Sequence, residues 1–126
     1  GGLNLSLRDA ARFGQTLLQQ GVWQGEQVIP TAAVQSISGG GDPAKFAGAG
    51  YITLPGGSYR SQWWALHNEN GAYSARGIHG QAIYVDPTAE LVIARFATFP
   101  ISFNAAIDPT SLPAYQAVAD YFIKRP

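Results

Sequence analysis

Three runs of strand-forming residues follow one another in the second half of this chain and most constrain its fold. Each run is rich in aromatic and β-branched residues, which favour strands, and turn sequences separate them. The runs are residues 59–67, 73–85 and 91–98. Asn70-Gly71 in the first turn is a strong hairpin signal, and Asp86-Pro87 begins the second turn. The pattern predicts an antiparallel meander, with residues 51–54 as a candidate edge strand.

A helix is expected near each end of the chain. Ser6, with Asp9 three residues later, is typical of a helix N-cap. Apolar residues at helical spacing continue from there toward Gly21, which favours a helix stop. For the last helix, Ser111 is a plausible cap and Pro113 fits the first turn, where its missing N–H costs little.

The remaining elements are short. A helix is expected from Pro30 to about Ile37, and the glycine-rich residues 39–50 are expected to form a loop. We therefore predict the α+β class, with a three- to four-stranded antiparallel sheet covered by the N-terminal and C-terminal helices.

Composition limits the classes of function. With 126 residues, 46% of them apolar, residues 1–126 should form a single domain with a buried core. The net charge is zero and only 13% of residues are charged, so no nucleic acid partner is expected. No apolar run is long enough for a membrane span, and no membrane partner is expected. Cysteine is absent, which excludes thiolate chemistry and disulfides within this chain.

The segment from Gly77 to Gln81 is the best candidate for a functional site. Gly77 and Gly80 lack a Cβ, so a ligand or another backbone could approach closely. His79 lies between them and can exchange protons near neutral pH. The alternative is a bulged strand with an incidental histidine. His67 is expected at the surface, and two histidines without a carboxylate cluster predict no metal site.

The aromatic residues of the sheet are expected to pack rather than to form a ligand cage. Alternation places Trp63 and Trp64 on opposite faces, so one of them must meet solvent, a ligand or another protein segment. Arg60 and Arg76 could bind a substrate carboxylate, although such residues more often pair with an acidic side chain. The chain has no Ser-x-x-Lys, Ser-x-Lys or Gly-x-Ser-x-Gly motif, and hence no convincing nucleophile.

Three strings together carry a family resemblance. They are the glycine-led helix start of residues 1–14, Tyr59 to Trp64, and Gly77 to Gln81 with Asp86-Pro87 following. The chain resembles the C-terminal part of the serine β-lactamase and penicillin-binding-protein-like hydrolases. The likeness is to the branch near class C β-lactamases and esterases, and within it to the amidases. The resemblance implies a β-lactamase-like fold.

The resemblance also implies a site. In this family a Ser-x-x-Lys serine attacks the carbonyl, and a Lys-Thr-Gly strand edges the pocket. The latter position falls at residues 75–77, Ala-Arg-Gly here, where only Gly77 keeps the family pattern. The backbone N–H of Ile78 would then be the second oxyanion-hole donor, with His79 lining the pocket and Gly80 allowing close approach. Tyr73, Trp63 and the segment near Asn104 are expected to form the substrate-binding rim.

The expected function is therefore that of a fragment. By resemblance the chain is the C-terminal portion of a serine amidase or esterase, inactive alone, whose partners are the N-terminal portion and a small amide or ester substrate. No cofactor is expected, a homo-oligomer is possible, and bacterial cytoplasm and periplasm both stay open. The alternative is a stand-alone binding or structural domain without a catalytic role.

Overall fold

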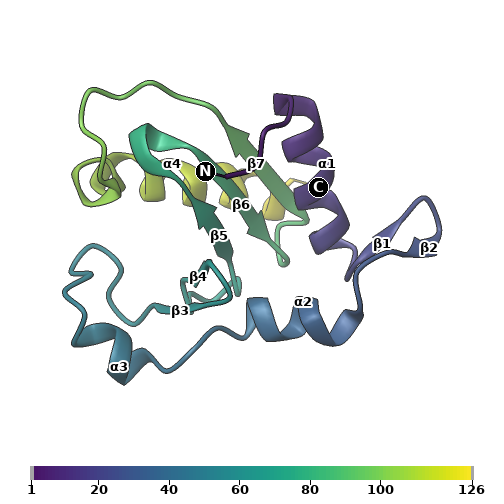
Figure 1. The fold of residues 1–126 in the computed structure, drawn as a ribbon, viewed down its shortest axis with the longest axis horizontal. Coiled ribbons are helices and arrows are strands. Elements are labelled where there is room, and N and C mark those ends of the chain that lie inside the picture. Colours follow the sequence, from purple (N-terminus) through teal and green to yellow (C-terminus); the bar gives the residue numbers. More distant parts are fainter. Residues whose placement is uncertain (1, 126) are drawn as a thin grey trace.

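A computed structural model describes residues 2–125, so Gly1 and Pro126 of the predicted domain lie outside the described residues. Its centre is a five-stranded antiparallel sheet in which sequential strands are neighbours, in the order β3-β4-β5-β6-β7 (Figure 1). The strands are β3 (Ser58–Arg60), β4 (Trp63–Ala65), β5 (Tyr73–Arg76), β6 (Ala82–Asp86) and β7 (Leu91–Arg95). The predicted meander is confirmed, but it has more strands than the three or four expected.

Besides this sheet, the described residues form four α-helices, two short 3₁₀ turns and a small hairpin. The helices are α1 (Leu7–Leu18), α2 (Thr31–Ser38), α3 (Pro43–Ala47) and α4 (Asp108–Ile123). The hairpin is formed by β1 (Val22–Trp23) and β2 (Glu26–Gln27), and the 3₁₀ turns are η1 (Ile78–Gly80) and η2 (Asn104–Ala106). Ser6 caps α1 as predicted, because its hydroxyl accepts the Asp9 N–H at 3.2 Å.

The sheet lies between helices. Helix α1 packs on β6 and β7, and α4 lies on the opposite face, behind the sheet in Figure 1. Gly14 makes the close approach of α1 possible, because a Cβ there would run into the side chain of Val92. Alternation along the strands gives two apolar clusters. The cluster on the α1 and α2 side is centred on Leu17, Val34, Trp63, Tyr73 and Val85, and the cluster under α4 on Ala72, Ala82, Tyr84 and Tyr115.

Two segments that were predicted as single strands each form a hairpin of two strands. The run 59–67 divides at Ser61 and Gln62, which both have positive φ, 50° and 67°, and turn β3 back along β4. The run 73–85 divides at Gly77–Gln81, where His79 and Gly80 have φ of 57° and 90°. In both cases residues other than glycine enter the left-handed region, which is uncommon for residues with a Cβ, although less so for a histidine such as His79.

Three smaller predictions also fail. Residues 51–54 form turns rather than an edge strand, closed by a Leu54 N–H to Tyr51 carbonyl bond of 3.1 Å. Helix α3 lies inside the expected loop, where Asp42 caps it through its side chain. Helix α4 begins at Asp108 rather than after Ser111, and an acidic residue in its first turn is favourable there.

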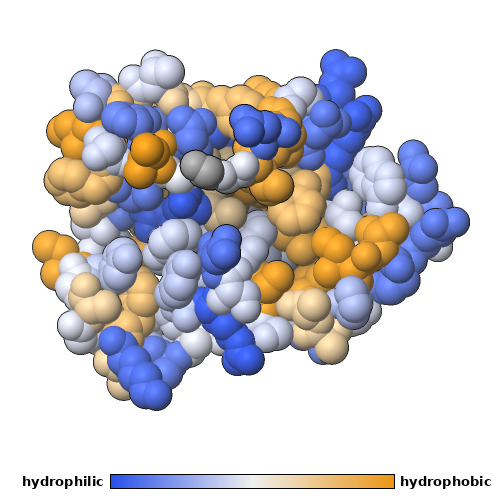
Figure 2. Space-filling model, in the orientation of Figure 1, coloured by the Kyte–Doolittle hydropathy of each residue, from blue (hydrophilic) through white to orange (hydrophobic). Residues whose placement is uncertain are grey.

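The surface carries several exposed apolar side chains. In Figure 2, hydrophobic residues gather at the left of this face, over the loop before β3 and the loop after β7. The exposed apolar residues of these two loops are Tyr51, Ile52, Phe96, Phe99, Ile101 and Phe103. No helix within residues 2–125 combines the length and apolar character that crossing a membrane requires.

Candidate functional site

The turn joining β5 to β6 comprises residues 77–81, and we call it the hairpin turn. It is closed by a hydrogen bond from the Gly77 N–H to the Gln81 carbonyl at 2.9 Å. Gly80, at φ 90°, lies directly against the ring of Phe99, leaving no room for a Cβ. Gly80 therefore makes space for a side chain of the same chain at this point.

The hairpin turn is fixed to the segment that follows β7. His79 donates its backbone N–H to the Ser102 carbonyl at 3.0 Å, and its ring Nδ1 lies 2.7 Å from the Phe99 carbonyl. The Gln81 amide donates to the Ala97 carbonyl at 2.5 Å and accepts the Ala97 N–H at 3.3 Å. These contacts come from both ends of the turn, so its backbone is held in one geometry.

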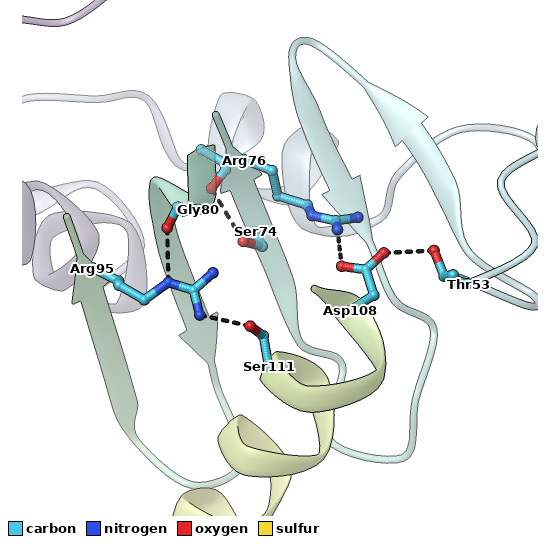
Figure 3. A network of polar contacts seen from close by, with 8 residues as sticks. Thr53, Ser74, Arg76, Gly80, Arg95, Asp108 and Ser111 are labelled. Atoms are coloured by element: carbon cyan, nitrogen blue, oxygen red, sulfur yellow. Dashed lines mark hydrogen bonds and ion pairs between the residues drawn. The ribbon is translucent and has the colours of Figure 1, made fainter. Parts of the chain in front are cut away.

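Arg95 of β7 adds a further anchor to the turn. Its Nε donates to the Gly80 carbonyl at 2.7 Å, and its Nη1 donates to the Ser111 hydroxyl of α4 at 2.6 Å (Figure 3). The guanidinium also lies 5.4 Å from the centre of the Phe99 ring. Strand, turn and helix are thus joined through one side chain.

Ile78 stands at the exposed tip of this anchored turn. Among the hydrogen bonds of residues 2–125, the Ile78 N–H has no acceptor, whereas the N–H groups of Gly77, His79 and Gln81 all have one. The residue is 66% exposed. An N–H without an acceptor on a rigid turn can donate to a ligand without breaking an existing bond.

The hairpin turn borders a cleft of about 400 Å³, which we call the hairpin cleft. Its lining includes Gly77 and Ile78 of the turn and Trp64 of β4, with residues of the two apolar loops around them. A second cleft of about 510 Å³ has Leu3 and Leu5, of the chain before α1, in its lining. Trp64 and Gly77 line both clefts, so the two meet at the end of β5.

A buried ion pair forms the floor of the hairpin cleft. Arg76 of β5 donates to one carboxylate oxygen of Asp108, and the Thr53 hydroxyl donates to the other at 2.5 Å (Figure 3). The side chains of Arg76 and Asp108 are 7% and 4% exposed. The Arg76 guanidinium also lies 5.8 Å from the centre of the Trp64 ring. Arg76 is therefore paired with an acidic residue, the more common outcome for such an arginine.

The structure brings only some of the predicted site residues to the cleft. Gly77 and Ile78 line it. Trp63 and Tyr73 instead pack together in the core, with ring centres 5.5 Å apart. Burial raises the pKa of the Tyr73 phenol to about 12. The His79 ring is turned toward the Phe99 carbonyl, and neither His79 nor Gly80 contributes to the lining.

Trp64 is the residue that motif reasoning missed. It is half-buried, its ring packs edge-on against Tyr59 at 4.7 Å, and it lines both clefts. Its indole N–H is buried without a hydrogen-bond partner among the described residues. Strand alternation was the signal that could have found it, since Trp63 occupies the core on the other face.

A serine and a histidine also meet outside the clefts. The Ser58 hydroxyl lies 2.7 Å from His67 Nε2, the spacing of a nucleophile and its base. Ser58, however, is completely buried, and it accepts the Gly41 N–H at 2.9 Å. Ser58 thus fastens the loop before α3 to β3, and it also contacts the exposed His67. A substrate cannot reach this serine.

No three His, Asp or Glu side chains within residues 2–125 converge in a way that could hold a metal ion. The hydroxyl groups in the lining of the hairpin cleft are those of Tyr51, Thr53 and Ser102, and the lining among the described residues includes no histidine or lysine to act as their base. The cleft is thus lined by apolar side chains, by the polar side chains Ser102 and Asn104, and by the paired charges of Arg76 and Asp108.

No protein-family profile matches the chain. The chain is 38% identical over 101 residues to the 6-aminohexanoate-dimer hydrolase of Paenarthrobacter ureafaciens. The aligned segment covers 79% of this chain and 26% of that protein. A solved structure of a candidate 6-aminohexanoate-dimer hydrolase from Bacillus anthracis has a TM-score of 0.79 to it at 35% identity. That match covers 99% of this chain and 31% of the other. The chain thus spans between a quarter and a third of the length of these relatives.

The comparisons confirm the predicted resemblance and the predicted α+β fold. The chain is a relative of the 6-aminohexanoate-dimer hydrolases and has the β-lactamase-like fold of part of such a protein.

Proposed function

We propose that this chain is the C-terminal portion of a serine hydrolase that cleaves an amide or an ester. It supplies one oxyanion-hole donor, the Ile78 N–H, and one wall of the substrate pocket, the hairpin cleft. The nucleophilic serine and its lysine come from the N-terminal portion, which is the partner of this chain. Alone, the chain is inactive as a hydrolase.

The observation that carries the proposal is the hydrogen-bonding state of Ile78. Its N–H has no acceptor within residues 2–125, and the residue lines a cleft of about 400 Å³ on a turn held by its neighbours. A preorganised donor of this kind stabilises the negative oxygen that develops when a carbonyl is attacked, and one such donor contributes about 3 kcal/mol. The relatives support the same reaction class, because both are described as hydrolases.

The donor can be removed with little change of geometry. Ile78 is the first residue of η1, a position where proline fits, and Gly77 before it has φ −116° and ψ 166°. These angles lie in the extended region that a residue before proline prefers. Ile78→Pro therefore deletes the N–H, whereas Ile78→Ala keeps the N–H and deletes the side chain, which makes it the matched control.

The test is a chimera in which residues 2–125 replace the matching segment of the Paenarthrobacter ureafaciens hydrolase. We expect the chimera to hydrolyse the 6-aminohexanoate dimer or an aliphatic nitrophenyl ester, and the isolated chain to hydrolyse neither. Ile78→Pro should lower kcat roughly a hundredfold or more, and Ile78→Ala should change kcat far less. If the Ile78→Pro and Ile78→Ala chimeras both fold and are equally active, the proposal is contradicted and the alternative, a binding or structural domain, is favoured.

A further inference from the structure

Arg95 carries a charge that no acidic side chain of residues 2–125 neutralises. The two ion pairs among the described residues join Arg12 to Asp9 and Arg76 to Asp108, and Arg95 takes part in neither. The residue is nevertheless half-buried. Burial of a cation costs free energy unless hydrogen bonds or other favourable contacts compensate for the lost water. The contacts of the Arg95 guanidinium must therefore offset this cost.

The guanidinium makes two hydrogen bonds and lies near two aromatic rings. Its Nε donates to the Gly80 carbonyl at 2.7 Å, and its Nη1 donates to the Ser111 hydroxyl at 2.6 Å (Figure 3). Its central carbon lies 5.4 Å from the centre of the Phe99 ring and 5.3 Å from the centre of the Tyr115 ring. Arginine can make this set of contacts because it presents several donors in a planar fork, whereas lysine presents a single ammonium group. Lysine is therefore not an equivalent residue at this position.

The Gly80 carbonyl is the point at which this fork acts on the hairpin turn. Gly80 has φ 90°, and a glycine has more rotational freedom of its backbone than any other residue. The bonds of His79 and Gln81 to residues outside the turn reach the segment 97–102. Arg95 instead holds the Gly80 carbonyl from β7 and, through Ser111, connects it to α4. The orientation of the turn therefore depends on the Arg95 side chain as well as on the segment after β7.

We propose that Arg95 is a positioning residue for the Ile78 N–H, because its forked guanidinium fixes the Gly80 carbonyl and with it the orientation of the hairpin turn. The inference rests on the proposed function, in which the Ile78 N–H binds the developing oxyanion. Such a donor must lie about 2.7 to 3.1 Å from the oxyanion, and a displacement of about 1 Å can lower the rate about a hundredfold. Arg95 acts through the turn and not on the substrate, since it is not among the described residues that line either cleft.

Two variants of Arg95 and two controls test the proposal. Arg95→Lys keeps the charge and loses the fork, whereas Arg95→Met loses both and keeps an unbranched apolar side chain. Arg12→Lys makes the first substitution at an exposed arginine of α1. Ser58→Ala lowers stability at another place in the fold, because Ser58 binds Gly41 and His67 rather than the hairpin turn. The controls therefore separate the loss of the fork from a change of residue type and from a general loss of stability.

The first measurement is the order parameter of the Ile78 amide in the intact chain, obtained by nuclear magnetic resonance relaxation. We expect a value of about 0.85, typical of rigid backbone, for the parent chain and for both controls. Both Arg95 variants should fall below about 0.6. Circular dichroism establishes which variants are folded, and Arg95→Lys alone decides the result if Arg95→Met is unfolded. An Ile78 amide that stays rigid in a folded Arg95 variant would overturn the inference.

The second measurement places the same four substitutions in the chimera and determines kcat and KM at a temperature where all of them are folded. Arg95→Lys should lower kcat at least about tenfold and change KM no more than about twofold, since the lost interaction belongs to the transition state. Arg12→Lys and Ser58→Ala should keep the parent kcat. A change confined to KM, or an equal loss of kcat in Arg95→Lys and Ser58→Ala, would show that Arg95 has only a structural role.

The two measurements distinguish failure of this inference from failure of the proposed function. If the Ile78→Pro chimera keeps full activity, the catalytic role of Ile78 fails, whatever the order parameters of the Arg95 variants are. If Ile78→Pro abolishes turnover while Arg95→Lys keeps a rigid Ile78 amide and the parent kcat, the proposed function stands and the role of Arg95 is wrong.

Discussion

The ring of Phe99 lies against Gly80 so closely that it occupies the space of a missing Cβ. Gly80→Ala should therefore force the ring or the hairpin turn to move, in addition to the strain of an alanine at φ 90°. Gly25 is the matched control, because it has φ 85° and a Cβ added there would meet nothing within 4 Å. Urea unfolding should show a loss of about 1 kcal/mol for Gly25→Ala and a clearly larger loss for Gly80→Ala. Equal losses would mean that Phe99 does not press on the turn.

The Arg76 and Asp108 pair should be among the most sensitive polar contacts of the fold. Arg76→Met leaves the Asp108 carboxylate buried without a cation, which costs about 3 to 5 kcal/mol. Arg12→Met tests the same chemistry at the surface, because Arg12 and Asp9 are 51% and 53% exposed at 2.9 Å. That variant should lose no more than about 0.5 kcal/mol. Similar losses for both variants, measured by chemical unfolding, would show that the buried pair is not desolvated.

Ser58 should be important for stability without being a nucleophile. Ser58→Ala removes the acceptor of the Gly41 N–H and the partner of His67 in one change. We expect a loss of about 1 to 3 kcal/mol, the cost of leaving a buried polar group unsatisfied. Thr98→Ala is the control, because Thr98 is exposed. A melting temperature for Ser58→Ala as high as that of Thr98→Ala would argue that water replaces the serine.

Tyr73 should make stability depend on alkaline pH. Its folded-state pKa of about 12 lies above the usual value of 10.0, because burial disfavours the phenolate. The unfolded chain therefore releases this proton first, so the contribution is complete below pH 10 and is lost between about pH 10 and 12. Stability curves of the chain and of Tyr73→Phe should diverge in that interval. Parallel curves would show that the phenol ionises equally in both states.

The sequence predicted the elements whose signals are local. Ser6 capped the first helix as expected because the hydroxyl and the N–H that it accepts are three residues apart. The start of α4 was predicted wrongly because Asp108, its first residue, is held by hydrogen bonds from Arg76 and Thr53. These residues are far away in the sequence, so no local pattern reveals them. The turn at Ser61 and Gln62 was missed because it lacks the glycine or asparagine that normally marks positive φ.

The same distinction applies to the site. Glycine spacing and family resemblance drew attention to Gly77 and Ile78, and the structure places both at a cleft. The assignment of Trp63 and Tyr73 to a rim required knowledge of which sheet face is covered, and both faces carry helices. Trp64 reaches the cleft because β4 is short and lies near one edge of the sheet, a property that depends on the unpredicted hairpin of β3 and β4.

The bonds that hold the hairpin turn all originate within the described chain, from residues between 77 and 111. Under the proposed function, the Ile78 N–H is therefore held in place before the N-terminal portion docks. Under that proposal, the N-terminal portion meets a rim that is already shaped, and the pocket is completed by docking rather than by joint folding.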